Sequence, residues 1–245
     1  MQICERLLTE MRPNAAGQRV ARVSVGLGYT AVSTSEGGAG LAFTAFGNKH
    51  ACKVLDDIPD YEDRPAMELL EAITSESSVH RSMALALVNA LNHPEARSLP
   101  EDRSNRVLFE LLGVVRGTRL AMGGYFAPLI ARLERQGVEL EIFDIGHRIG
   151  SLEQFTDRLS GWAQALILTS TSLLNDTAES MLAAVGPQVR VAMIGPSTPL
   201  VAAAFAGLPV HVLAGTVPVD MTGTFKAIRH GRGTPVLQKF ARKVY

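Results

Sequence analysis

The sequence predicts an α/β protein in which an N-terminal α+β domain precedes a parallel-sheet domain. Short apolar segments separated by glycine clusters fill residues 20–46, a pattern typical of an antiparallel meander. After Gly117 short apolar runs alternate with helical segments, which is typical of a parallel sheet covered on both faces. Gly113 and Gly117 bracket a polar turn where the pattern changes. We therefore place the two domains at residues 1–113 and 114–245.

Three helices are predicted to follow the meander. Pro65–Ile73 begins with a proline, which suits a first helical position. The apolar segment Ser77–Leu91 begins with a serine cap, and His93-Pro94 is expected to end it. A third helix is predicted over Arg103–Leu112.

The second domain is predicted to be a parallel sheet with a helix after each of its first four strands. The strands are expected at Arg119–Met122, Leu140–Ile145, Ala165–Thr169, Val191–Ile194 and Val210–Ala214. The helices are expected at Ala127–Gln136, Leu152–Gly161, Thr177–Ala184 and Leu200–Ala206. Such sheets bind ligands at the carboxyl ends of their strands, so the loops after these strands form the candidate site.

The apolar stretch Leu200–Val219 needs separate treatment because it has the length of a membrane span, about twenty residues. Gly207, Pro209 and Pro218 interrupt it, so we expect a buried helix followed by a buried strand.

Composition narrows the classes of partner. The chain has 24 acidic and 24 basic residues, so no overall field favours nucleic acid or an anionic membrane. Two cysteines form no disulfide framework and suit a reducing compartment. The first residues lack the long apolar core of a signal peptide. We expect a cytoplasmic protein without nucleic-acid or membrane partners; a homo-oligomer is compatible with the sequence.

Hydroxyl and amide side chains gather where the third predicted strand ends, in TSTSLLNDT. Thr169, Ser170, Asn175 and Thr177 supply uncharged donors and acceptors at a helix start, where a polar or anionic group can bind. Helix capping alone would need only one such residue, so we expect the others to contribute to a site.

The fourth predicted strand ends in MIGPSTPL. Gly195 permits close approach of another group, Pro196 stiffens the loop, and Ser197 or Thr198 caps the next helix. A rigid turn explains the prolines but explains the paired hydroxyls only in part. Asn89 lies in the apolar helix MALALVNAL, where an unpaired amide would cost about 1–3 kcal/mol, so it must bond to a loop backbone or to a ligand.

Two other motifs point to different chemistry. The turn AMGGYFAP is followed at a suitable distance by Asp144, but Ala127-Pro128 replaces the third glycine of a dinucleotide fingerprint, so we do not expect a nicotinamide dinucleotide. His50 and Cys52 in NKHACK would point the same way from a strand and could begin a zinc or copper site. Two ligands do not complete such a site, and a solvated loop is the alternative.

Several separated strings resemble the family described as "Putative heavy-metal chelation", whose members are small prokaryotic proteins of undefined function. These strings are VSVGLGYTAV, GGAGLAFT, SSVHRSMALALVNAL, ILTSTSLLNDT, MIGPSTPL and VLAGTVPVD. The resemblance implies an enolase-N-terminal-like domain followed by a Rossmann-like domain. It also implies a site in the cleft between them, formed by Asn89, Thr169, Ser170, Asn175, Thr177, Gly195, Pro196, Ser197 and Thr198.

These residues suit a polar organic ligand, an oxyanion or a chelated metal better than a bare cation. We therefore expect the interdomain cleft to bind a small polar or anionic ligand, such as a metal chelate or a cofactor precursor. One alternative is a lyase or transferase of metal-cofactor or metallophore metabolism, with Glu36, Asp144 or Asp220 as its acid or base. The others are direct metal binding by His50 and Cys52, and a nucleotide-dependent enzyme.

Overall fold

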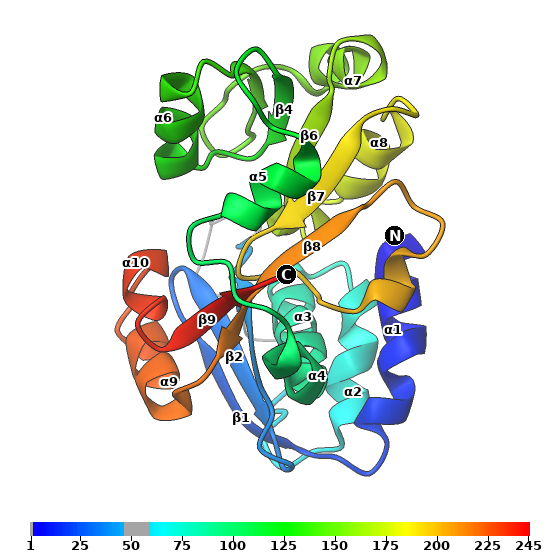
Figure 1. Ribbon diagram of the computed structural model, residues 1–245. Helices are drawn as coiled ribbons and strands as arrows, with labels where there is room; N and C mark the ends of the chain where they lie inside the picture. The colour runs from blue at the N-terminus through cyan, green and yellow to red at the C-terminus, as the bar shows by residue number, and fades with distance from the viewer. Residues whose placement is uncertain (1, 47–58) are drawn as a thin grey trace.

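The computed structural model describes residues 2–46 and 59–245. This part of the chain forms a three-stranded antiparallel sheet of order β1-β2-β3 and a six-stranded sheet of order β5-β4-β6-β7-β8-β9 (Figure 1). The predicted α/β class, with a meander before a largely parallel sheet, is therefore confirmed. His50 and Cys52 lie outside the described residues.

The N-terminal sheet is buried on both faces. Its strands are β1 (Val20–Val25), β2 (Tyr29–Thr34) and β3 (Ala39–Phe43). The helices packed on it are α3 (Ser78–Leu91), α9 (Met221–Arg229) and α10 (Thr234–Leu237). Ala31 and Leu41 pack with α9 and α10, whereas their neighbours Val32 and Ala42 pack with α3. The alternation follows from the two-residue period of a strand.

Further helices surround α3 and connect the two sheets. They are α1 (Gln2–Ala15), α2 (Ala66–Glu71) with the 3-10 turn η2 (Ala72–Thr74), α4 (His93–Ser98) and α5 (Arg106–Leu112). Ser77 caps α3 as predicted, since its side chain accepts a hydrogen bond from the backbone N–H of His80.

The large sheet is parallel except for its last strand. Its strands are β4 (Arg119–Gly123), β5 (Glu139–Phe143), β6 (Ala165–Thr169), β7 (Arg190–Ile194), β8 (Val212–Pro218) and β9 (Ala241–Val244). Its helical segments are α6 (Ala127–Arg135), α7 (Leu152–Gly161), η3 (Ser170–Leu173), α8 (Ala178–Ala183) and η4 (Ala202–Phe205).

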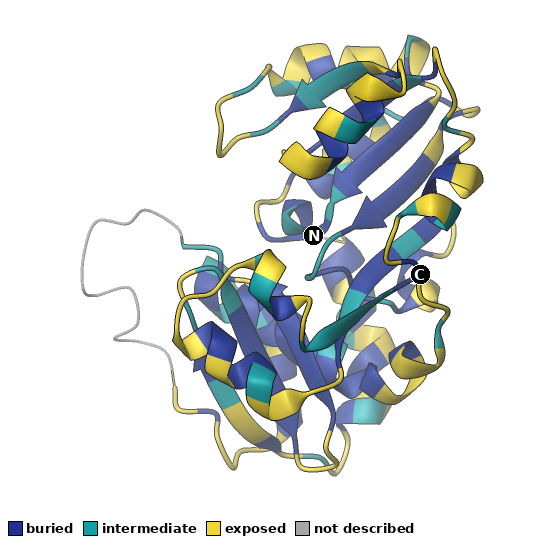
Figure 2. Ribbon diagram, turned by 60° about the vertical axis from the view of Figure 1, so that its left-hand side comes forward, coloured by how far each residue is buried: buried dark blue, intermediate teal, exposed yellow. Residues whose placement is uncertain are grey.

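Both faces of the large sheet are also covered. Leu166 and Leu168 pack in one core with α7 and α8, whereas Ala165 and Ile167 pack in another with α5 and α6. Figure 2 shows the inner strands of both sheets as mostly buried and exposed residues on the outer sides of the helices, while the edge strands β1, β5 and β9 are partly exposed. In Figure 1, β8 extends from the large sheet toward the meander, which places the two sheets side by side.

Several predicted boundaries differ from the structure. The helix predicted at Leu200–Ala206 is reduced to the turn η4, because Val201 has non-helical angles and Gly207 turns the chain with a φ of 77°. Helix α3 ends at Leu91, as predicted, and His93-Pro94 then begins α4, where a proline in the first turn needs no N–H partner. Helix α5 starts later than predicted because Asp102 accepts hydrogen bonds from its first backbone N–H groups.

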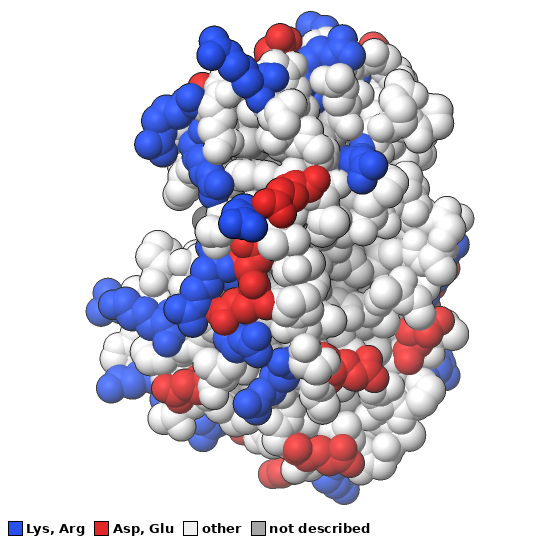
Figure 3. All heavy atoms as spheres, viewed as in Figure 1, with Lys and Arg blue, Asp and Glu red and all other residues white. Residues whose placement is uncertain are grey.

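The elements at the two ends of the chain have no predicted counterpart. These are α1, α9, α10 and β9, and the last pairs antiparallel with β8 at the sheet edge. Within the described ranges, no helix combines the length and the apolar character that a bilayer crossing requires. Figure 3 shows acidic and basic side chains interspersed on the viewed face.

Helix α3 lies against β3 at a distance that requires glycine. A Cβ atom at Gly40 would lie 2.2 Å from the carbonyl oxygen of Ala86, and one at Gly38 would lie 2.2 Å from that of Ala90. Both neighbours are backbone atoms of α3, so the helix would have to move as a unit to admit a side chain.

We expect Gly40→Ala to lower the free energy of unfolding by about 3 kcal/mol, the upper range for overpacking a core. Urea denaturation measures the change. Gly28→Ala is the matched control in the same meander, since a Cβ there has no atom within 4 Å, and it should change stability by less than about 1 kcal/mol. Equal losses in the two variants would refute the close-packing argument.

Candidate functional site

A cavity of about 540 Å³ lies between the two sheets. Its walls come from the β1–β2 turn, the end of β3, and the loops that follow β4, β5 and β6, so both halves of the chain contribute. It is large enough for a small organic molecule.

The strand order explains why the cavity forms at this point. The chain leaves β4 through α6 to β5 on one side, then returns through α7 to β6 on the other side of β4. The two helices pack on opposite faces of the sheet. The connections therefore diverge between β4 and β6. Open α/β sheets bind ligands in the crevice at such a switch point.

Two glycines end β4 at the switch point. Gly124 has a φ of 122°, and a Cβ there would lie 2.7 Å from the Cβ of Thr169 at the end of β6. A Cβ at Gly123 would lie 3.0 Å from side-chain atoms of Leu168 and Met181. Glycine is thus required because the β4 and β6 ends approach each other closely.

Polar side chains of the loop after β6 line one wall. The Thr169 hydroxyl lies 3.0 Å from that of Thr171 and caps η3. The Asn175 Oδ1 accepts hydrogen bonds from the N–H and hydroxyl of Thr177, at 3.3 and 2.7 Å. These contacts hold the side chains in place and leave the Asn175 amide group as a donor.

A buried arginine of helix α3 anchors the loop after β6. Arg81 of α3 donates to Asp176 Oδ1 at 2.6 Å and to the carbonyl of Leu174 at 2.5 Å. Its side chain is 7% exposed, whereas that of Asp176 is 54% exposed. The loop that carries Asn175 and Thr177 is therefore tied to the N-terminal half of the chain.

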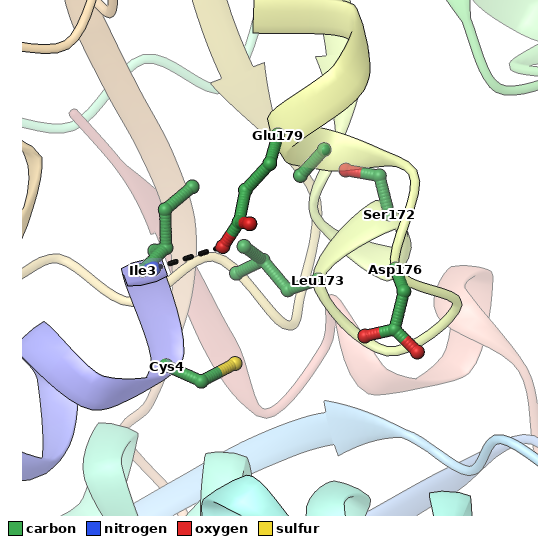
Figure 4. A pocket seen from close by; sticks show the side chains of 7 residues that line it. Ile3, Cys4, Ser172, Leu173, Asp176 and Glu179 are labelled. Atoms are coloured by element: carbon green, nitrogen blue, oxygen red, sulfur yellow. Dashed lines mark hydrogen bonds between the residues drawn. The ribbon is translucent and has the colours of Figure 1, made fainter. Parts of the chain in front are cut away.

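Helix α1 contacts the far side of the same loop. Figure 4 shows Glu179 directed toward the first turn of α1, where its Oε1 accepts a hydrogen bond from the backbone N–H of Ile3 at 3.1 Å. Cys4 lies beside them, and burial raises the pKa of its thiol to about 11. The thiol therefore stays protonated near neutral pH, which disfavours a role as nucleophile or metal ligand.

The opposite wall carries Asp144 and His147. Asp144 Oδ2 accepts a hydrogen bond from the backbone N–H of Tyr125 at 2.9 Å, and Oδ1 accepts one from the backbone N–H of His147 at 2.7 Å. The His147 Nδ1 lies 2.9 Å from the same Oδ1. The rings of His147 and Tyr125 pack with centroids 4.4 Å apart.

Exposed apolar side chains also line the cavity. Leu27 and Phe43 come from the meander, while Tyr125 and Ile145 come from the large sheet; their exposed fractions run from 38% to 80%. They form an apolar surface around the cavity that is exposed to solvent. The lining described here contains no lysine or arginine.

The structure brings three of the nine predicted site residues to this cavity: Thr169, Asn175 and Thr177. The other six are Asn89, Ser170, Gly195, Pro196, Ser197 and Thr198, and they are not part of its lining. Ser170 is buried, and a Cβ at Gly195 would lie 2.9 Å from its hydroxyl oxygen.

Ser197 and Asn89 instead join the two halves of the chain. The Ser197 hydroxyl oxygen accepts a hydrogen bond from the backbone N–H of Phe43 at 2.7 Å. The Asn89 amide donates to the carbonyl of Leu41 at 2.7 Å and to that of Ser197 at 3.5 Å. These contacts fix the end of β3, and with it the Phe43 wall of the cavity.

Of the acid–base candidates, Asp144 lines the cavity. Asp220 caps α9 by accepting a hydrogen bond from the backbone N–H of Gly223, and Glu36 is exposed outside the cavity lining. His147 was not among the predicted residues. The sequence feature that could have identified it is its position three residues after Asp144, because a turn of that length brings the two side chains together.

The described residues do not provide a site for a bare metal ion. Among residues 2–46 and 59–245, no three His, Cys, Asp or Glu side chains lie close enough together to hold one. In the cavity itself Asp144 and His147 are the two such side chains of the described lining. Two such side chains fall short of the ligand set that a protein metal site needs.

Residues 107–245 match the family model described as "Putative heavy-metal chelation", and residues 8–92 match a second model with the same description. A member from Pyrococcus horikoshii, of unknown function, superposes with a TM-score of 0.79 at 16% identity over 98% of each chain. Another, from Desulfitobacterium hafniense and also of unknown function, has a TM-score of 0.78 at 16% identity, covering 99% of this chain and 96% of that one. These identities show a shared fold. No curated protein matches the chain.

We expect Arg81→Met to lower the free energy of unfolding by about 2 kcal/mol, because it removes charge-assisted hydrogen bonds to a buried carbonyl and to Asp176. Hydrogen exchange of residues 171–177 should accelerate. Arg64→Met is the control: its ion pair with Glu68 is half exposed on both sides and should contribute less than about 1 kcal/mol. Unchanged exchange in the Arg81 variant would contradict the anchoring role.

Proposed function

The chain belongs to the family described as "Putative heavy-metal chelation", and we propose that it binds a small organic chelator or its metal complex in the cavity between the two sheets. The observation that carries the proposal is the composition of that cavity. Hydroxyl and amide groups line one wall, while exposed apolar and aromatic side chains from both halves of the chain surround the rest.

This lining matches a ligand with two kinds of surface. Thr169, Thr171 and Asn175 offer hydrogen-bond donors and acceptors to the oxygen or nitrogen atoms of a chelator. Phe43 and Tyr125 offer apolar area to a flat carbon skeleton. Because the described lining has Asp144 but no lysine or arginine, it favours neutral or cationic ligands over phosphates and nucleotides.

A chelated metal fits the cavity better than a bare ion does. A bare transition metal needs about four ligands of the His, Cys or carboxylate type, and the two such side chains of the described lining bond to each other. A chelator brings its own set of ligands. The protein would then recognise the organic part, which is the chemistry that hydroxyls, amides and aromatic rings perform.

Blocking the cavity should abolish ligand retention. Ala45 lines the cavity and is partly exposed, so Ala45→Trp places an indole in the binding volume. We expect native mass spectrometry to detect a small molecule on the wild-type protein and none on this variant. Ala131→Trp, on the exposed side of α6, is the matched control and should retain the molecule.

A second test of the proposal measures the melting temperature of the protein in the presence of added probes. The probes are benzohydroxamic acid, its iron complex, and free zinc and copper ions. We expect the hydroxamate or its complex to raise the melting temperature of the wild-type and Ala131→Trp proteins. The Ala45→Trp protein should remain folded and show no rise. A wild-type protein with neither a retained molecule nor a hydroxamate response would refute the proposal, as would equal responses in the two tryptophan variants.

Protein without an affinity tag distinguishes direct metal binding from binding of a chelator. Elemental analysis after exposure to zinc and copper should show no stoichiometric metal in the absence of a chelator. Stoichiometric metal that disappears in a His50→Ala, Cys52→Ser double variant would establish the alternative site.

A further inference from the structure

Asp144 is held in one orientation by the main chain. Its two carboxylate oxygens accept hydrogen bonds from the backbone N–H groups of Tyr125 and His147, which belong to the loops after β4 and β5. The side chain is 17% exposed. A carboxylate bonded in this way cannot rotate without losing both contacts, so it is a fixed acceptor.

The fixed carboxylate determines how the His147 ring is protonated. Nδ1 lies 2.9 Å from Asp144 Oδ1, and an ionised carboxylate can only accept hydrogen bonds. Nδ1 therefore carries a proton, and in the neutral ring the lone pair is on Nε2. Packing against the Tyr125 ring restricts the imidazole further. A histidine oriented by a carboxylate is a common arrangement for proton transfer.

We propose that His147 accepts a proton from an acidic hydroxyl of the bound ligand, with Asp144 as the positioning residue. The inference rests on the proposed function, since it needs a ligand in the cavity. The ligand O–H bond breaks, its electron pair stays on the oxygen, and a bond forms between the proton and His147 Nε2. The imidazolium is then stabilised by the Asp144 carboxylate.

The charges of the cavity agree with this transfer. The described lining holds Asp144 and His147 but no lysine or arginine to receive a ligand that arrives as an anion. Transfer within the site converts a neutral ligand and a neutral imidazole into an adjacent anion and cation, so the net charge is unchanged. Chelating oxygens must lose their protons before they bind a metal, so the ligand class is a chelator with a phenolic or hydroxamic O–H.

The test uses 4-nitrophenol, a small aromatic acid whose neutral and anionic forms absorb at different wavelengths. Full-length protein is titrated into the probe at a pH where the free probe is mostly neutral. Equilibrium dialysis measures binding in the same samples. We expect saturable binding together with the absorption band of the anion.

His147→Gln should lose the anion band and bind the probe more weakly, in its neutral form. Asp144→Asn should weaken the band more than it weakens binding, because the imidazolium loses its carboxylate partner. His230→Gln, at an exposed position after α9, is the control and should behave as the wild type.

The outcomes separate the two proposals. Binding that is blocked by Ala45→Trp but gives no anion band overturns the proton transfer and leaves the cavity as a ligand site. An anion band that persists in His147→Gln also overturns it. Absence of saturable probe binding to the wild type overturns the inference and counts against the proposed function as well.

Discussion

Helix α3 is the constraint on which the arrangement of this protein depends. It is buried along most of its length, yet its polar side chains reach the backbone of segments that belong to both sheets. Arg81 holds the loop after β6, Ser82 accepts a hydrogen bond from the backbone N–H of Ala45, and Asn89 bonds to the carbonyls of Leu41 and Ser197. Asn92, which follows the helix, donates to the carbonyl of Leu200. Apart from the exposed Asp176, these partners are buried or partly buried, so losing one of those contacts leaves an unpaired group at a cost of about 1–3 kcal/mol.

The cavity is a consequence of this arrangement together with the strand order. The large sheet alone would offer a crevice between β4 and β6, open on one side. The contacts of α3 and Ser197 bring the end of β3 opposite that crevice, so that Phe43 forms a wall that the large sheet does not supply. The glycines at the end of β4 keep the crevice narrow at its base. That the cavity has walls from both halves of the chain therefore follows from packing within the protein.

Periodicity explains why the fold was predictable from the sequence. Val32 and Leu166 lie in one core that both sheets share, while their neighbours Ala31 and Ile167 each lie in a different core on the opposite face of their sheet. This pattern is visible in the sequence as short apolar runs. The candidate site was less predictable, because the sequence does not show whether a hydroxyl or amide side chain bonds to the protein backbone or faces a cavity. Ser197 and Asn89 have the chemistry of ligand-binding residues but use it on backbone groups of the protein, whereas Thr169, Asn175 and Thr177 face the cavity. His147 was missed because its role depends on a turn that ends β5 earlier than the apolar pattern indicates.

The packing of α9 and α10 on the meander has a consequence for synthesis on the ribosome. Ala31 and Leu41 on the N-terminal sheet are covered by Phe225, Ile228 and Leu237, which are translated about two hundred residues later. A nascent chain that has not yet reached Met221 therefore exposes one apolar face of its first sheet. Folding of this sheet is completed only after the parallel sheet has emerged, so the order of folding does not follow the order of synthesis, and the unfinished face stays exposed in the meantime.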